Sequence, residues 1–165
     1  MKTCSIIFVL VISSLTVWGQ AQPDPPYKRF PTLPPLKLLL TDSVTQFTDK
    51  DLKKNKAVFL FIFSPDCDHC QKETEELIEK IDSFKNIQIV MATILPFDKM
   101  KSFYETYKLS QYPNIIVGHD YQYLLSTYYR MRTLPFLAFY DKKGNLIDGV
   151  EGALPLTKVL RYFNN

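Results

Sequence analysis

The stretch that decides the fold is an apolar run followed by a proline turn and two closely spaced cysteines, Phe59-Leu60-Phe61-Ile62-Phe63-Ser64-Pro65-Asp66-Cys67-Asp68-His69-Cys70. Residues 57–63 contain no polar side chain, which predicts a strand buried on both faces, as in the centre of a parallel sheet. Residues 71–84 predict a helix, because apolar residues recur there at steps of three and four. The two cysteines therefore fall where a buried strand gives way to a helix.

This position favours negative charge on sulfur. The first backbone N–H groups of a helix have no partner within it, and the helix dipole adds positive potential at the same end. A thiolate held there is a nucleophile near neutral pH. The polar residues of the predicted helix are expected to form a solvated face, made of Lys72, Glu73, Glu75, Glu76, Glu79 and Lys80.

Length and composition limit the classes of protein that the chain can be. It has 165 residues, of which 46% are hydrophobic, enough for one folded domain with a core. The formal net charge is only +3, and no basic stripe is interleaved with aromatic residues. Nucleic acid is therefore excluded as an expected partner.

The N-terminus predicts a signal peptide over residues 1–21. A positive Lys2 precedes an apolar run at 6–15, and Gly19-Gln20-Ala21 offers small residues at a cleavage site. The run is too short to span a bilayer well. If it stays uncleaved, this segment would be the protein's one contact with a membrane. Cleavage removes Cys4 and leaves Cys67 and Cys70, which form a disulfide in an oxidising compartment unless something reduces it.

The rest of the chain alternates between strands and helices. Six prolines make residues 22–35 an expected extended tether. Strands are predicted at 36–41, 57–63, 87–95, 115–117, 134–140 and 146–150, and helices at 48–52, 71–84, 97–107, 120–129 and 154–163. This order predicts an α/β fold with a mixed central sheet flanked by helices, closed by a hairpin and a final helix. Active groups in such sheets lie beyond the carboxyl ends of parallel strands, where the cysteines fall.

The buried strand is followed by the Ser64–Cys70 motif and a helix, and Thr133-Leu134-Pro135 opens a later strand. In these features the chain resembles the thioredoxin-like superfamily. The additional elements between residues 87 and 129 and the signal sequence are most similar to its exported bacterial TlpA-type branch. The resemblance covers about residues 36–163, and we take residues 36–165 as a thioredoxin-like domain. It implies a periplasmic thiol–disulfide oxidoreductase. It implies protein thiol or disulfide clients and a redox partner, a monomer, and no cofactor besides the redox-active disulfide.

The resemblance also assigns roles to residues. Cys67 matches the exposed attacking thiolate and Cys70 the buried resolving thiol. Pro135 matches the family's cis-proline, and the backbone before it, at Leu134, is where a substrate strand would pair. His69 matches a histidine of DsbA-type oxidases and disulfide isomerases that stabilises the thiolate. Asp68 acts in the opposite sense, because a nearby carboxylate disfavours a thiolate.

Three positions depart from the family. Asp66 stands where many members have tryptophan, and Asp68 replaces the common glycine or proline. Phe61 occupies the strand position of a buried aspartate that moves the proton of the second cysteine in thioredoxin. The sequence therefore leaves the general base for Cys70 unidentified. The direction of reaction also stays open, since the TlpA-type resemblance favours a reductant and His69 an oxidant or isomerase.

Other interpretations of the cysteine pair remain. A purely structural disulfide would close only a four-residue loop, which contributes little stability. A tetrahedral metal site needs four ligands, and the chain offers Cys67, Cys70, His69 and His119. Two thiolates alone suit copper(I). A peroxidase would use one cysteine with a threonine three positions before it. Ser64 stands there, but the rest of the peroxiredoxin pattern is absent. A non-catalytic binding module, carrying copper or holding clients, is the main alternative to a redox enzyme.

Overall fold

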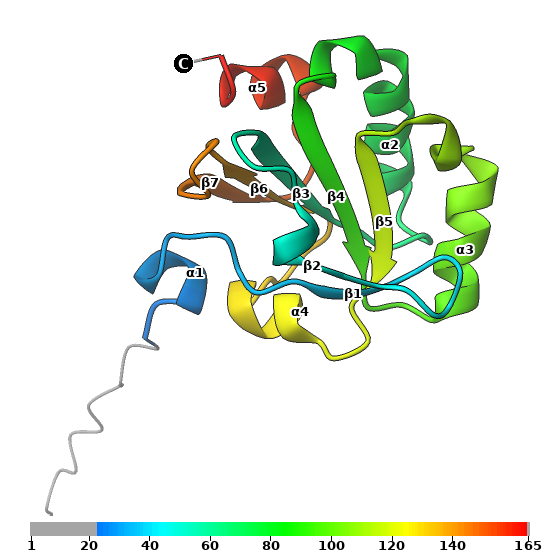
Figure 1. The fold of residues 1–165 in the computed structure, drawn as a ribbon, viewed down its shortest axis with the longest axis horizontal. Coiled ribbons are helices and arrows are strands. Elements are labelled where there is room, and N and C mark those ends of the chain that lie inside the picture. The colour runs from blue at the N-terminus through cyan, green and yellow to red at the C-terminus, as the bar shows by residue number, and fades with distance from the viewer. Residues whose placement is uncertain (1–22, 165) are drawn as a thin grey trace, which may run out of the picture.

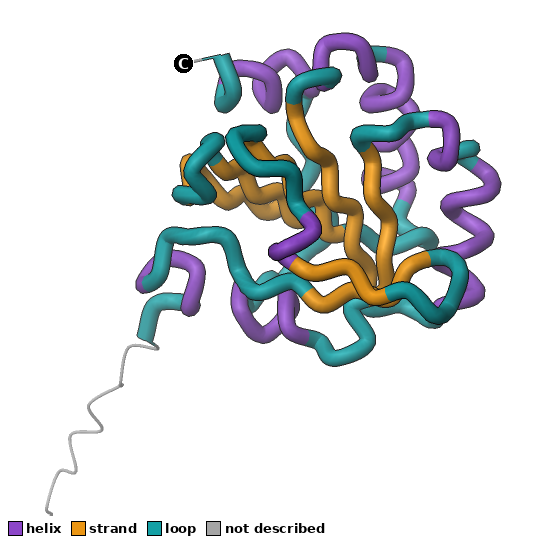
Figure 2. Tube along the Cα trace, in the orientation of Figure 1, coloured by secondary structure: helices purple, strands orange, loops and turns teal. Residues whose placement is uncertain are grey.

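The computed structural model describes residues 23–164, so the predicted signal peptide at 1–21 and Cys4 lie outside the described residues. A seven-stranded sheet with the order β2-β1-β5-β4-β3-β6-β7 carries helices on both faces (Figures 1 and 2). The strands are β1 (Lys37–Leu40), β2 (Gln46–Thr48), β3 (Ala57–Ile62), β4 (Ile87–Thr93), β5 (Ile115–His119), β6 (Phe136–Tyr140) and β7 (Leu146–Glu151). The helices are α1 (Pro26–Arg29), α2 (Asp68–Glu79), α3 (Phe97–Thr106), α4 (Leu124–Tyr129) and α5 (Leu156–Arg161), with 3-10 turns η1 (Asp49–Asp51), η2 (Ile81–Phe84) and η3 (Leu109–Gln111). None of the described helices has the length and apolar character needed to cross a membrane.

The apolar run at 57–62 is the central strand β3, as its composition predicts. It pairs in parallel with β4 and antiparallel with β6, and all six of its residues are buried. Because it is covered on both faces, polar residues at any of these positions would have been costly. The predicted mixed α/β sheet flanked by helices is confirmed.

Alternate residues of β3 contribute to two separate cores. Phe59 and Phe61 face a cluster that includes side chains of α2, α3 and α5, whereas Val58 and Leu60 face one that includes side chains of α4. Figure 1 shows α2 and α3 together on one side of the sheet and α4 with α1 on the other. A short loop, residues 63–67, joins the carboxyl end of β3 to the N-terminus of α2.

The structure differs from the prediction in the bounds of its helices and in one additional strand. The helix expected over 71–84 starts earlier, at Asp68, and ends at Glu79, because Lys80 leaves the helical region with φ −109° and ψ 19°; a 3-10 turn then covers 81–84. The edge strand β2 (Gln46–Thr48) was not predicted. Only one of its three residues, Phe47, is buried, so its sequence carries little periodicity.

The expectation that residues 22–35 form an extended tether is wrong for 26–29. These residues form the one-turn helix α1, and Pro26 at its first position has the φ that a helix start requires. Tyr27 then packs against the core cluster on the α4 face. The proline content of this segment indicates an extended chain. Packing of the Tyr27 ring against the core stabilises the helical turn instead.

The close approach of β1 to β5 requires glycine at position 118. A Cβ atom at Gly118 would lie 2.6 Å from the Cβ of Leu38 and 3.4 Å from the carbonyl oxygen of Leu39. We therefore expect Gly118→Ala to lower the free energy of unfolding by about 1–3 kcal/mol, because the strands must separate. Urea unfolding would measure this, with Gly152→Ala as a comparison, since no atom lies within 4 Å of the Cβ there although φ is +88°. Equal stability of Gly118→Ala and the wild type would contradict the close approach.

Candidate active site

The loop between β3 and α2 presents the two cysteines. Beyond β3, the N–H of Phe63 continues the ladder by donating to the carbonyl oxygen of Ala92 at 2.9 Å. The chain then turns, and the Cys67 N–H donates to the Ser64 carbonyl oxygen at 3.1 Å. The side-chain amide of Gln71 donates to the carbonyl oxygen of Pro65 at 2.8 Å and fixes the turn to the helix. Cys67 consequently becomes the N-cap residue of α2.

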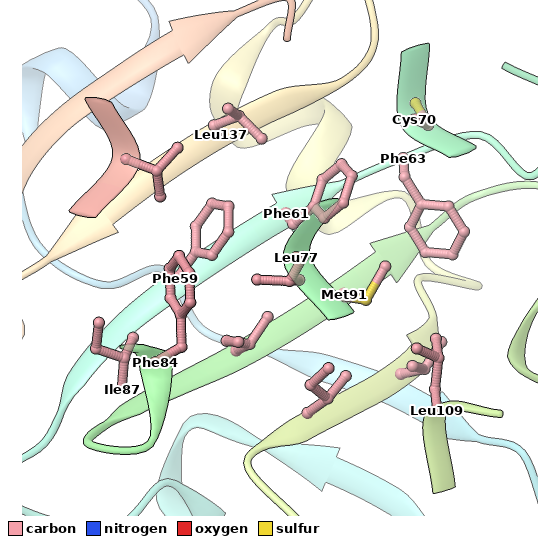
Figure 3. Packing of buried hydrophobic residues seen from close by; sticks show 14 of the residues in the cluster. Phe59, Phe61, Phe63, Cys70, Leu77, Phe84, Ile87, Met91, Leu109 and Leu137 are labelled. Atoms are coloured by element: carbon pink, nitrogen blue, oxygen red, sulfur yellow. The ribbon is translucent and has the colours of Figure 1, made fainter. Parts of the chain in front are cut away.

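Cys67 and Cys70 have different environments, as the resemblance implies. Cys67 is half-buried, whereas Cys70, one turn further along α2, is completely buried in the core cluster with Phe61 and Phe63 (Figure 3). Both are free thiols. An accessible sulfur with a second, buried sulfur close by is an arrangement that suits thiol–disulfide exchange, because the second thiol can resolve a mixed disulfide formed by the first.

The segment before β6 lies opposite Cys67. The peptide bond between Leu134 and Pro135 is cis, as the resemblance implies. The Cys67 thiol donates to the carbonyl oxygen of Leu134 over 3.8 Å. The structure thus brings together Cys67, Cys70, Leu134 and Pro135 from two segments that are more than sixty residues apart in the sequence.

The electrostatics of the site keep Cys70 protonated. Burial is the largest cause that raises the pKa of the Cys70 thiol far above its usual range. The hydrogen bond and charge of Cys67 and the charge of Glu73 act in the same direction, and the backbone at Ser64 acts in the opposite one. Cys70 therefore needs a proton acceptor before it can attack another sulfur.

Glu73 is the buried acid that the sequence analysis missed. The charge pattern predicts that Glu73 lies on the solvated face of the helix, but this prediction is wrong: its exposed fraction is 3%. Neither carboxylate oxygen has a hydrogen-bond partner among the described residues. Burial raises the pKa of Glu73 to about 8, with a smaller contribution from the charge of Glu76 and an opposing one from the Leu154 backbone.

The three-residue spacing between Cys70 and Glu73 is the sequence signal that could have indicated an acid beside the buried thiol. Residues three apart on a helix are neighbours on its surface, so position 73 lies beside Cys70, at the edge of the helix face that packs against the core. The segment Ala153-Leu154-Pro155 covers this edge and borders, with His69 and Glu73, a cavity of about 220 Å³. The buried carboxylate near Cys70 thus comes from α2, whereas an apolar residue, Phe61, stands at the β3 position of the family's acid.

The remaining predicted residues lie at the rim. Asp68 and His69 are exposed on the first turn of α2, and His69 borders the cavity beside Glu73. Asp66, in the family's tryptophan position, forms an ion pair with Lys99 of α3 at the edge of a cavity of about 350 Å³. The rim therefore contains charges of both signs.

The four-ligand metal set is not assembled. His119 ends β5, where it pairs with Thr93 and Leu39 and packs against the ring of Phe97. Within residues 23–164, no group of three or more His, Cys, Asp or Glu side chains is arranged to hold a metal ion. His119 is thus separate from the cysteine pair.

Comparison with known proteins agrees with this geometry. The sequence profile of the thioredoxin-like domain family matches residues 48–165, which include β3, both cysteines and Pro135. The chain belongs to the thioredoxin-like domain family. No curated protein sequence matches it.

Solved structures with the same fold are distant in sequence. A secreted Mycobacterium tuberculosis disulfide oxidoreductase homologous to E. coli DsbE has 18% identity and a TM-score of 0.64, covering 77% of this chain and 92% of that chain. StoA from Bacillus subtilis has 15% identity and a TM-score of 0.59, covering 80% and 98%. The peroxidoxin BcpB from M. tuberculosis has 16% identity and a TM-score of 0.66, covering 79% and 92%. These likenesses establish the fold, and the activity has to be argued from the site.

Proposed function

We propose that this protein is an exported thiol–disulfide oxidoreductase that acts on protein clients through Cys67 and Cys70. The observation that carries the proposal is the half-buried Cys67 at the start of α2, with the buried thiol of Cys70 behind it and the Leu134 carbonyl in front. Export is supported by the signal-peptide pattern of residues 1–21 and by the likeness to a secreted disulfide oxidoreductase. For a bacterial protein of the TlpA type, the compartment would be the periplasm.

The exchange proceeds in two steps. The Cys67 thiolate attacks one sulfur of a client disulfide, forming a mixed disulfide and releasing the other client sulfur as a thiolate. Cys70, once deprotonated, attacks the sulfur of Cys67, which forms the Cys67–Cys70 disulfide and releases the second client thiolate. The client gains two electrons and two protons, and the cysteine pair loses them. Run in reverse, the same steps oxidise a client dithiol.

Glu73 supplies the proton acceptor that the second step needs. The Cys70 thiol is buried and its pKa is raised, so water cannot easily remove its proton. Glu73 lies one helical turn away, and its pKa of about 8 places its titration close to the working range of a general base. The cavity bordered by Glu73 and His69 gives the carboxyl group a route for proton exchange with solvent.

A Cys70→Ser variant tests the proposal, because it can complete only the first step. Mixed with a disulfide-containing protein such as insulin, it is expected to accumulate a covalent complex through Cys67, which reducing agent dissolves. Electrophoresis without reductant and mass spectrometry of the linked peptide would identify the bond. The double variant Cys67→Ser/Cys70→Ser is the matched control and should form none. If Cys70→Ser forms no complex either, Cys67 is not the nucleophile and the proposal is wrong.

The fold also occurs in peroxidases, as the likeness to a peroxidoxin indicates. A peroxidase would reduce hydrogen peroxide at Cys67 with no need for the Leu134 backbone. The accessible–buried pair and the Leu134 contact instead favour a disulfide as substrate. We expect the reduced protein to react faster with insulin disulfides than with hydrogen peroxide at equal concentration, and the opposite order would favour the peroxidase.

A further inference from the structure

The N-terminal arm, which we define as residues 23–33, touches both ends of the loop that faces Cys67. This loop, residues 130–135, is called the Leu134 loop here. The ring of Tyr27 lies 5.4 Å from that of Tyr129, immediately before the loop, and 5.7 Å from that of Phe136, immediately after it. One side chain of the arm therefore contacts the residues on both sides of the loop.

Hydrogen bonds hold the arm in this place. The guanidinium of Arg130, the first residue of the Leu134 loop, donates to the carbonyl oxygen of Pro23 at 3.0 Å. The Tyr128 hydroxyl lies 2.6 Å from the carbonyl oxygen of Phe30 and 2.9 Å from that of Thr32, and its single proton is shared between these two acceptors. The arm is thus fixed to the end of α4 at several points.

The sheet leaves space for the Tyr27 ring. A Cβ atom at position 149 of β7 would lie 2.9 Å from Cε2 of Tyr27 and 3.3 Å from Cζ of Phe136. Because Gly149 has no side chain, the ring lies directly on the strand beside Phe136. A larger residue at 149 would push Tyr27 away from both of its partners.

The Leu134 loop is attached on its other side to the end of β7. The carboxylate of Glu151 accepts hydrogen bonds from the Arg132 N–H and the Thr133 hydroxyl, each at 3.3 Å, and the Gly152 N–H donates to the Pro135 carbonyl at 2.8 Å. The arm and the end of β7 therefore hold the loop from two sides. A cavity of about 320 Å³ lies between the arm and the Leu134 loop. On this side, few groups of the arm therefore touch the loop and its flanking residues.

We propose that the N-terminal arm is a part of the active-site scaffold and that Tyr27 is a positioning residue for the Leu134 loop. The inference rests on the proposed disulfide exchange. The Leu134 carbonyl borders the Cys67 sulfur, and Arg132 and Thr133 are exposed beside it. A protein segment that brings its disulfide to Cys67 must lie against this loop, whereas a small disulfide needs little of it.

The test compares these two kinds of substrate. For Tyr27→Ala we expect kcat/KM toward insulin disulfides to fall about tenfold, mainly through KM, since two aromatic contacts are lost. The rate of Cys67 with a small aromatic disulfide, 5,5′-dithiobis(2-nitrobenzoate), should change less than about twofold by the same reasoning. Tyr27→Phe should restore the wild-type values, because no hydrogen bond of the Tyr27 hydroxyl is found among the described residues. Phe30→Ala is the matched control, since that ring belongs to the same arm and its exposed fraction is 58%.

Two further measurements make the outcome decisive. Tyr128→Phe removes the hydrogen bonds that hold Phe30 and Thr32 of the arm, and so loosens the segment that keeps Tyr27 against Tyr129 and Phe136. It should produce a selective loss of the same kind, and it replaces Tyr27→Ala as the test if that variant fails to fold. Amide hydrogen exchange at residues 132–134 should be faster in either variant, which tests the hold on the loop even if the wild type reacts with no disulfide. Unchanged exchange and unchanged insulin reduction in both variants would overturn the inference, as would an equal loss toward both substrates.

Discussion

Replacement of Cys67 by serine is expected to abolish reduction of insulin disulfides, with a fall in rate of at least about a thousandfold. The reason is that Cys67 carries the sulfur at the start of α2 that a client can reach, whereas the Cys70 sulfur is completely buried. Serine keeps the size of the side chain but offers a hydroxyl that is not ionised at neutral pH. Turbidity from precipitating insulin chains, followed with a chemical reductant present, would measure the loss.

The control for this variant is Ser64→Ala. Ser64 lies in the same turn, and its hydroxyl accepts from the Asp66 N–H at 3.3 Å. We expect Ser64→Ala to keep activity within about threefold, because the hydroxyl takes no part in the exchange. Substantial insulin reduction by Cys67→Ser would contradict the assignment of the nucleophile. Equal losses in the two variants would instead indicate damage to the turn.

Replacement of Glu73 by glutamine is expected to slow the release of the client from the mixed disulfide by about a hundredfold. Glutamine keeps the shape of the side chain but cannot accept the proton of the Cys70 thiol. In the wild type the rate of this step should rise with pH through about 8, the pKa of Glu73, because only its ionised form is a base. In the variant this rise should vanish. Stopped-flow measurement of client release between pH 6 and 9 would detect the difference.

Glu73→Gln is also expected to change how the free energy of unfolding depends on pH. The pKa of Glu73 is raised from 4.5 to about 8 on folding, so the folded state binds the proton more tightly than the unfolded state. The free energy of unfolding must therefore fall as pH rises through that interval. The fall attributable to Glu73 is on the order of 5 kcal/mol at most, and Glu73→Gln should remove it. Glu79→Gln, at an exposed position on the same helix, is the control and should keep the wild-type pH dependence. An unchanged pH dependence in Glu73→Gln would show that Glu73 titrates normally.

The local part of the site could be predicted from the sequence, because short segments determine it. An unbroken apolar strand, a turn with Pro65 and an amphipathic helix place Cys67 at a helix start whatever the rest of the chain does. The three-residue spacing then directs Cys70 inward. The alternating order of elements likewise defines a mixed sheet whose carboxyl edge carries the cysteines.

The sequence could not reveal contacts that depend on distant segments. Glu73 is an acidic residue in a run of charged residues, and it is buried because the segment 153–155, some eighty residues later, covers it. The arm contains many prolines, and its folding depends on Tyr27 meeting Tyr129 and Phe136 about a hundred residues away. In both cases tertiary packing overrides a local preference.

The most direct test of the account is the redox equilibrium of the Cys67–Cys70 pair in glutathione buffers, read by alkylating free thiols after acid quenching. We expect one two-electron transition with a midpoint between about −270 and −120 mV, the range of thiol–disulfide oxidoreductases. A pair that remains two thiols in fully oxidised glutathione would contradict the central claim. So would a bond that forms with a midpoint below about −300 mV, as in structural disulfides.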